Sequence, residues 1–271
     1  MTRTEPSGER PRPPVGSGGI GSFYADRVHG AFYPPSTARP VPSRYRWIAD
    51  RARRYTDGRS ARVLEIGPEV PQTAAAWVRA IGVPLERASF VDVSGPAVSL
   101  LRAAGLRVDE VDISTDTLPY EDASFDLVVA SEVLEHLLDA DHALREIRRV
   151  LRADGGLVLT TPNLASWANR VQLALGYQPL GTETGREWVF GRGPHVPPAR
   201  PVGHLQLFTR RGLDALLRFH RLRPVGWVGL PYSEEIPAAR RIRWIDRWFA
   251  RFPALASDLL VVAEPEESAS R

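Results

Sequence analysis

The chain contains no cysteine and no lysine among its 271 residues. Without cysteine it can form no disulfide bond, no thiolate metal site and no thiol nucleophile. Without lysine it can form no Schiff base with a carbonyl substrate. All 35 basic residues are arginine, and they are interleaved with 32 acidic residues. Because a nucleic-acid groove needs basic residues clustered on one face, nucleic acid is not an expected partner.

Long apolar runs are also missing. No segment approaches the roughly 18 consecutive apolar residues of a membrane-spanning helix, although peripheral contact with a membrane remains open. The first residues lack the apolar core of a secretory signal and are rich in Pro, Gly, Ser and Arg, so we expect residues 1–22 to be a disordered tail. The missing signal favours a cytoplasmic location, and nothing in the sequence predicts an oligomeric state.

From residue 62 onward, short β-branched runs alternate with longer amphipathic segments, which is typical of parallel strands joined by crossover helices. Ser94 and Pro96 predict a helix start that Gly105 ends, and the Asp-Gly-Gly turn at 154–156 is expected to end a later helix. We therefore predict a doubly wound, Rossmann-like α/β sheet. The expected strands are residues 62–66, 88–93, 106–111, 125–130, 156–161, 223–230 and 258–264.

The chain divides into a core domain and flanking parts. We expect an N-terminal helical cap at residues 23–60, the core domain at 61–265 and a tail at 266–271. Regular alternation breaks after the fifth strand, where residues 163–208 contain an amphipathic piece and a Gly- and Pro-rich stretch. Long loops within compact domains are usually functional, so this insert is predicted to be a lid that binds the acceptor substrate.

Polar residues follow the ends of the predicted strands, where open parallel sheets bind ligands. They are Glu65 and Gly67, Asp92, Asp112, Ser131 and Glu132, and Asn163. Such a row of acids suits a ligand with ribose hydroxyls, an amino-bearing base and a positive centre better than a ligand with several phosphates.

The segments LPYEDASFDLVVASEVLEHL (118–137) and LREIRRVLRADGGLVLTTPN (144–163), with the acids in this order, resemble the class I S-adenosylmethionine-dependent methyltransferases of the type 11-like group. The resemblance covers about residues 45–265. It implies a seven-stranded sheet whose last strand is antiparallel, with S-adenosylmethionine as cofactor. It also implies close backbone approach at Gly67, ribose binding by Asp92, and adenine contacts from Asp112 and the Ile113 backbone N–H. Glu65 and Ser131 complete the expected cofactor set.

The loop after the first strand departs from the family pattern. Residues 63–73 read VLEIGPEVPQT, so Gly67 is kept while Glu69 and Pro71 stand where further glycines are usual. Glu69 would favour a sulfonium or ammonium group and repel phosphate, which argues against a dinucleotide. The departure also supports a rival hypothesis, a binding or regulatory protein that kept the fold and lost the cofactor.

Glu132, Glu135 and His136 are expected on one helical turn directly after the fourth strand. Three interpretations stay open. The resemblance to sugar-hydroxyl methyltransferases makes His136 a general base, some quinone-pathway relatives bind a divalent cation with a Glu-x-x-Glu-His set, and the residues could simply brace the helix. His204 is a second candidate base, and Glu132, Asn163 and Arg170 are candidate acceptor-binding residues.

These patterns predict an S-adenosylmethionine-dependent O-methyltransferase acting on a hydroxyl of a glycan, glycoside or other natural product. A small-molecule N- or carboxyl-methyltransferase remains an alternative. A nucleic-acid methyltransferase is disfavoured, because the fourth strand ends in SEVLEH rather than in an Asn-Pro-Pro-Tyr-like motif. The amphipathic segment 238–252 is expected to pack on the sheet, with contact to an anionic membrane as the less favoured interpretation.

Overall fold

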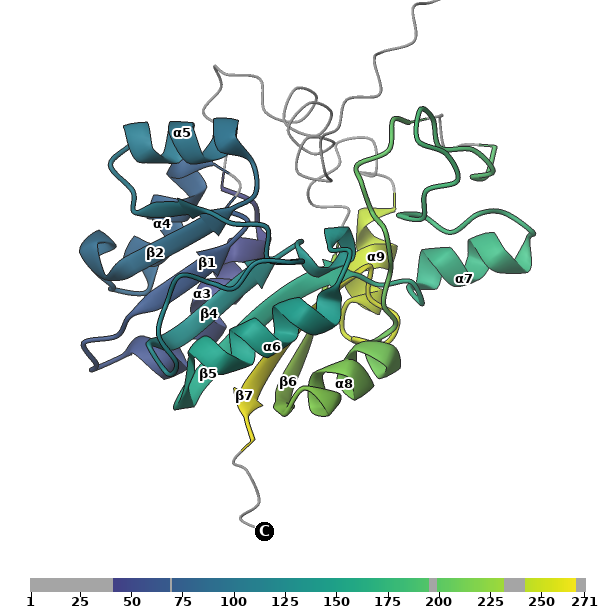
Figure 1. Ribbon diagram of the computed structural model, residues 1–271. Coiled ribbons are helices and arrows are strands. Elements are labelled where there is room, and N and C mark those ends of the chain that lie inside the picture. Colours follow the sequence, from purple (N-terminus) through teal and green to yellow (C-terminus); the bar gives the residue numbers. More distant parts are fainter. Residues whose placement is uncertain (1–40, 69, 195–198, 232–241, 267–271) are drawn as a thin grey trace, which may run out of the picture.

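The computed structural model describes residues 41–68, 70–194, 199–231 and 242–266. Its centre is a seven-stranded sheet in the order β3-β2-β1-β4-β5-β7-β6 (Figure 1). The five strands of one half pair in parallel, while β7 runs antiparallel to both β5 and β6. This confirms the expected α/β fold and its antiparallel last strand. The strands are β1 (Val63–Ile66), β2 (Ala88–Asp92), β3 (Val108–Glu110), β4 (Phe125–Ser131), β5 (Leu151–Pro162), β6 (Leu222–Leu230) and β7 (Asp258–Pro265).

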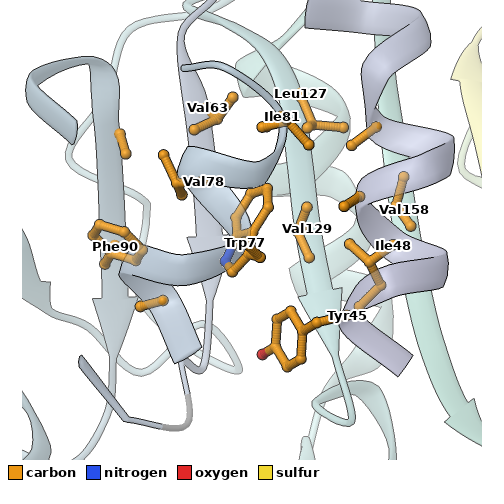
Figure 2. Packing of buried hydrophobic residues seen from close by; sticks show 14 of the residues in the cluster. Tyr45, Ile48, Val63, Trp77, Val78, Ile81, Phe90, Leu127, Val129 and Val158 are labelled. Atoms are coloured by element: carbon orange, nitrogen blue, oxygen red, sulfur yellow. The ribbon is translucent and has the colours of Figure 1, made fainter. Parts of the chain in front are cut away.

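Helices cover both faces of the sheet. One buried cluster joins α3 (Arg44–Thr56), α4 (Pro71–Ala80) and α5 (Gly95–Ala103) to the sheet, and Figure 2 shows Trp77 and Ile48 packed against strand residues at its centre. The second cluster joins α6 (Ala140–Val150) and α8 (Arg210–Phe219) to the other face. Successive strands are added on one side of β1 up to β3 and on its other side from β4 onward, so a crevice for ligands is expected beyond the carboxyl ends of β1 and β4.

Two helix starts follow directly from sequence. Ser94 caps α5 by accepting a hydrogen bond from the Ala97 backbone N–H at 3.5 Å, and Gly105 follows the helix with φ of +82°. Pro71 occupies the first turn of α4, where its missing N–H costs no hydrogen bond. Glu69, which was expected to favour a sulfonium or ammonium group, lies outside the described residues.

The Asp-Gly-Gly prediction was wrong in detail. Helix α6 ends at Val150 and β5 begins at the next residue, so residues 154–156 lie inside the strand. There the pairing with β4 shifts between Leu151 and Gly156, and residues 152–154 form an exposed bulge. Glycine is needed at 156 because a Cβ would lie 2.3 Å from the Tyr55 ring of α3. The glycine therefore serves close helix packing rather than a turn.

The insert after β5 begins with α7 (Trp167–Ala174), which is anchored to the last part of the chain. The Trp167 backbone N–H donates to Leu255 O, and its ring stacks on Phe249 of α9 (Arg243–Phe249). Farther along, Gln178 donates to Gly191 O and Val189 to Ala199 O, so the described insert is held by backbone hydrogen bonds. The predicted N-terminal tail, residues 23–40 of the helical cap and residues 267–271 lie outside the described residues. No helix in the described residues is long and apolar enough to span a membrane.

Candidate functional site

The loop after β1 packs against the segment that follows β4. Gly67 adopts φ of +65°, a left-handed conformation that glycine takes without a steric penalty. A Cβ at this position would lie 2.7 Å from Val133 Cγ2, so any side chain here would displace the neighbouring segment. The one retained glycine therefore occupies the position where the backbone conformation and the space both require it.

Glu65 is fully buried beneath this loop. The Tyr45 hydroxyl donates to its Oε1 at 2.9 Å, and Trp77 Nε1 donates to its Oε2 at 2.7 Å. Burial raises the pKa of Glu65 to about 7 against the opposing effect of these two donors and of Arg44. Glu65 thus connects α3 and α4 to β1. We expect any effect of Glu65 on a cofactor to be indirect, by holding these elements in position.

Asp92 ends β2 at the same edge of the sheet. Its Oδ1 accepts a hydrogen bond from the Ser94 backbone N–H at 2.8 Å, which fixes the carboxylate at the start of α5. Burial raises the pKa of Asp92 to about 7, and the neighbouring charge of Glu110 adds to this effect. Ionisation of such a carboxylate is favoured by further hydrogen-bond donors, and the ribose hydroxyls of a nucleoside are donors of this kind.

Asp112 begins the turn after β3. Its Oδ1 accepts from the Ser114 backbone N–H at 3.0 Å, and its own N–H donates to Asp116 Oδ2 at 3.1 Å. Ile113 is buried between them, and the Ser114 hydroxyl accepts from the Leu138 N–H. The turn is therefore held in one conformation, with Asp112 partly buried at the carboxyl edge.

At the end of β4, Ser131 and Glu132 form hydrogen bonds with Thr160 of β5. The Ser131 hydroxyl lies 3.1 Å from the Thr160 hydroxyl, which donates to Glu132 Oε1 at 2.8 Å. Glu132 has φ of +56°, an uncommon conformation for a residue with a side chain. It consequently lies outside the short 3-10 helix Leu134–His136, and the expectation of one helical turn holding both glutamates and His136 was wrong.

Glu135 points into the protein from this short helix and has no solvent exposure. The Thr161 hydroxyl donates to its Oε2 at 3.0 Å, while Oε1 has no hydrogen-bond partner within the described chain. Burial raises the pKa of Glu135 well above its usual range, and the charge of Glu132 acts in the same direction.

The two candidate bases come together. The rings of His136 and His204 have centroids 4.8 Å apart. His136 Nδ1 lies 3.0 Å from Gly203 O and His204 Nδ1 lies 2.8 Å from Gly181 O. Because a carbonyl only accepts, the Nδ1 of each ring carries a proton. Burial lowers the pKa of His136 to about 4, and His204 contributes to this shift, so His136 is neutral near pH 7.

The same residues form a potential cation-binding group. One ligand atom from each of Glu135, His136 and His204 lies within 4.8 Å of the others. Glu132, which the sequence pattern placed in this set, instead bonds Thr160. His204 replaces it because the insert folds back onto the end of β4.

Asn163 and Arg170, the remaining candidate acceptor residues, form hydrogen bonds with the protein backbone. Asn163 is buried, and its side-chain amide donates to Ala256 O at 2.8 Å while Oδ1 accepts from the Ala165 N–H. Arg170 Nε donates to Ala165 O at 2.8 Å. Their visible role is to hold the start of the insert in place.

Arg44 is a site residue that sequence reasoning missed. Its Nε donates to the Ser131 hydroxyl at 3.1 Å, and its charge opposes the raised pKa of Glu65. It starts α3, 87 residues before Ser131, so only the folded chain shows that a guanidinium lies at this edge of the sheet.

Two curated relatives match short parts of the chain. A probable S-adenosylmethionine-dependent methyltransferase of Mycobacterium tuberculosis is 42% identical over 73 residues, which is 27% of each chain. The 27-O-demethylrifamycin SV methyltransferase of Amycolatopsis mediterranei is 55% identical over 42 residues, 16% of this chain and 15% of that protein. These matches span a minor part of each relative.

The fold has solved counterparts. A Burkholderia thailandensis 1,6-didemethyltoxoflavin-N1-methyltransferase, solved with that compound and S-adenosylhomocysteine, superposes with a TM-score of 0.54 at 18% identity. The superposition covers 92% of this chain and 88% of that one. A methyltransferase-domain family model matches residues 64–159, which run from β1 into β5 and include Gly67, Asp92, Asp112 and His136. Residues 64–159 therefore match a methyltransferase-domain family, and the sheet that contains them has the fold of class I S-adenosylmethionine-dependent methyltransferases.

Proposed function

We propose that the protein transfers a methyl group from S-adenosylmethionine to a hydroxyl group of a natural product, glycoside or glycan. The observation that carries this proposal is the neutral His136 imidazole, whose Nδ1–H is held by Gly203 O at the carboxyl edge of the sheet. The A. mediterranei relative is named for O-methylation of a natural product, which supports the same acceptor class.

The residues at the carboxyl edge fit S-adenosylmethionine. Gly67 leaves no side chain over the loop, and Asp92 and Asp112 present partly buried carboxylates beyond neighbouring strands. This acidic edge suits ribose hydroxyls and a positively charged ligand, whereas it would repel phosphates. In the proposed complex Asp92 holds the ribose, Asp112 and the Ile113 N–H contact the adenine, and Gly67 lines the cofactor. When bound, the cofactor supplies a methyl group on a positively charged sulfur.

His136 would act as the general base. An alcohol oxygen becomes a good nucleophile only as its proton leaves, and Nε2 of the neutral imidazole can accept that proton while the oxygen–carbon bond forms. The Gly203 carbonyl keeps the ring in the tautomer that has the lone pair on Nε2. Alignment of the acceptor oxygen by the surrounding site supplies the rest of the acceleration.

A second mechanism is favoured by the unpartnered Oε1 of Glu135. Buried carboxylate oxygens are usually hydrogen-bonded or bound to a metal. A divalent cation held by Glu135, His136 and His204 could bind the acceptor oxygen and lower its pKa. Carbonyl groups that fix the Nδ1–H of both histidines resemble the outer contacts of metal-binding histidines.

One experiment tests both mechanisms. The purified protein is incubated with S-adenosylmethionine and matched acceptors that carry a hydroxyl, an amine or a carboxylate, and release of S-adenosylhomocysteine is measured with and without EDTA. We expect turnover of hydroxyl acceptors and no loss with EDTA. Loss restored by one divalent ion, with that ion found in the protein by mass spectrometry, would favour the metal mechanism.

The rival non-catalytic hypothesis is tested by calorimetry. We expect folded protein to bind S-adenosylhomocysteine with a Kd of about 1 μM or tighter, near −8 kcal/mol. No binding of either cofactor form would contradict the proposed function. Turnover of amines alone would keep the methyltransferase and overturn the hydroxyl preference.

A further inference from the structure

Part of the insert is attached to the short helix that carries His136. The His136 Nδ1–H donates to Gly203 O at 3.0 Å. Just after Gly203, the backbone N–H groups of Leu205 and Gln206 both donate to Glu135 O, at 2.8 and 3.2 Å. The chain that follows Gly203 is therefore fixed to the segment that holds the proposed base.

Gly203 is the residue whose carbonyl direction needs support from elsewhere. It adopts φ of +94°, in the left-handed region that glycine enters without a steric penalty. Because glycine has more conformational freedom than any other residue, its own geometry does not fix the direction of its carbonyl. A lasting hydrogen bond to His136 consequently requires that the chain before Gly203 be held as well.

Glu183 holds the chain directly before this carbonyl. Its Oε1 accepts from the Val202 N–H at 2.5 Å and from the Gly203 N–H at 2.9 Å, and its Oε2 lies 3.2 Å from the same Gly203 nitrogen. Hydrogen bonds to an ionised acceptor are roughly twice as strong as those between neutral groups. One carboxylate thus fixes two successive peptide groups, and the next peptide group along the chain carries the Gly203 carbonyl.

The segment that carries Glu183 is itself anchored. Asn169 of α7 is buried, its Oδ1 accepts from the Leu180 N–H at 2.6 Å, and its side-chain amide donates to Leu180 O at 3.2 Å. The next residue, Gly181, accepts from His204 Nδ1 at 2.8 Å. Glu183 therefore extends from a segment that is fixed to α7 and already holds the second histidine.

We propose that Glu183 is a positioning residue for the proposed base, which aims the Gly203 carbonyl at His136 and so keeps the imidazole proton on Nδ1. It acts through the backbone of residues 202 and 203 and takes no part in the proton transfer itself. The inference rests on the proposed function, because Glu183 has this role only if His136 is the base.

The first test measures the tautomer of His136 without cofactor or acceptor. Because burial lowers the pKa of His136 to about 4, the ring is neutral near pH 7. Nitrogen NMR of isotope-labelled protein distinguishes a proton on Nδ1 from one on Nε2, and the signal lost in His136→Ala identifies the ring. We expect the proton on Nδ1 in the wild type and a second population with the proton on Nε2 in Glu183→Ala. Glu183→Asp withdraws the carboxylate by one methylene group and should show the same change to a smaller extent.

Two further variants are the controls. Glu183→Gln keeps an acceptor oxygen for both backbone N–H groups, so the wild-type spectrum of His136 should largely return. Glu187→Ala is the matched control, because this glutamate is exposed farther along the same insert, and its spectrum should equal that of the wild type. Circular dichroism would verify that each variant folds. A wild-type His136 spectrum in both Glu183→Ala and Glu183→Asp, or the same change in Glu187→Ala, overturns the proposal.

Turnover is the second test. Glu183→Ala should lower kcat by about 10- to 100-fold and leave KM within about twofold, because the base is misaligned while the acceptor still binds. Glu183→Gln should restore most of this loss. A changed His136 spectrum with wild-type kcat would overturn the positioning role. Failure of the proposed function would show in the wild type, as absence of turnover with hydroxyl acceptors, whereas failure of this inference shows only in the Glu183 variants.

Discussion

The two halves of the carboxyl edge are built differently. The proposed cofactor half consists of residues at or just after the end of a strand that bond to the chain just after them, as Asp92 does with Ser94 and Asp112 with Ser114. The acceptor half joins distant segments, as His136 does with Gly203 across 67 residues. Local construction keeps the first half independent of the insert, whereas the second half exists only when the insert is folded onto β4. Variants in the two halves should therefore affect different measurements.

The largest effect is expected in the acceptor half. His136→Ala removes the proposed base and should lower kcat by about 100- to 10,000-fold. Cofactor binding should stay within about twofold, because the His136 ring bonds to Gly203 of the insert. The measurements are single-turnover kinetics and calorimetry with S-adenosylhomocysteine. His142→Ala is the matched control, since that histidine lies on α6 and bonds Asp116 O. Equal loss of cofactor affinity and turnover would contradict the division into halves.

A smaller effect is expected in the cofactor half. Asp92→Asn removes a charged acceptor from the proposed ribose site and should raise the Kd for S-adenosylhomocysteine by about 10- to 100-fold. Because burial raises the pKa of Asp92 to about 7, wild-type affinity should also weaken as the pH falls from 8 to 6. The asparagine variant should lose this dependence, and calorimetry at several pH values would show it. An unchanged pH dependence in the variant would assign the titration to another group.

The smallest effect concerns stability. Glu65 has its pKa raised to about 7 in the folded protein, so the folded state binds its proton more tightly than the unfolded state does. This carboxyl therefore contributes a loss of stability as pH rises from about 4.5 to about 7. Glu65→Gln should flatten the curve of unfolding free energy against pH in that window, as measured by denaturant unfolding. Tyr45→Phe removes one donor to the same carboxylate, which raises its folded-state pKa further and should extend the loss of stability to higher pH.

The sequence predicted the sheet, and the position of an acid or a glycine at its carboxyl edge, because these signals are local. An apolar run followed by an acid or glycine marks the end of a strand, and Gly67, Asp92 and Asp112 follow that rule, whereas Glu65 lies inside β1. The contacts of His204 and Arg44 had no such signal, since each depends on how a distant segment folds back. Glu132 was misplaced for a different reason: its left-handed backbone ends the strand before the short helix begins, and glutamate rarely marks that conformation.

The Gly203 carbonyl has a consequence for protein engineering. The insert that is expected to shape the acceptor pocket also sets the tautomer of His136 through this single backbone oxygen. Exchanging residues 163–208 between relatives would thus change both the preferred substrate and the ability of His136 to accept a proton. A chimera could recognise a new alcohol and yet leave its proton in place unless the donor segment restores a carbonyl at the position of Gly203. The range of acceptors and the catalytic activity would then change together.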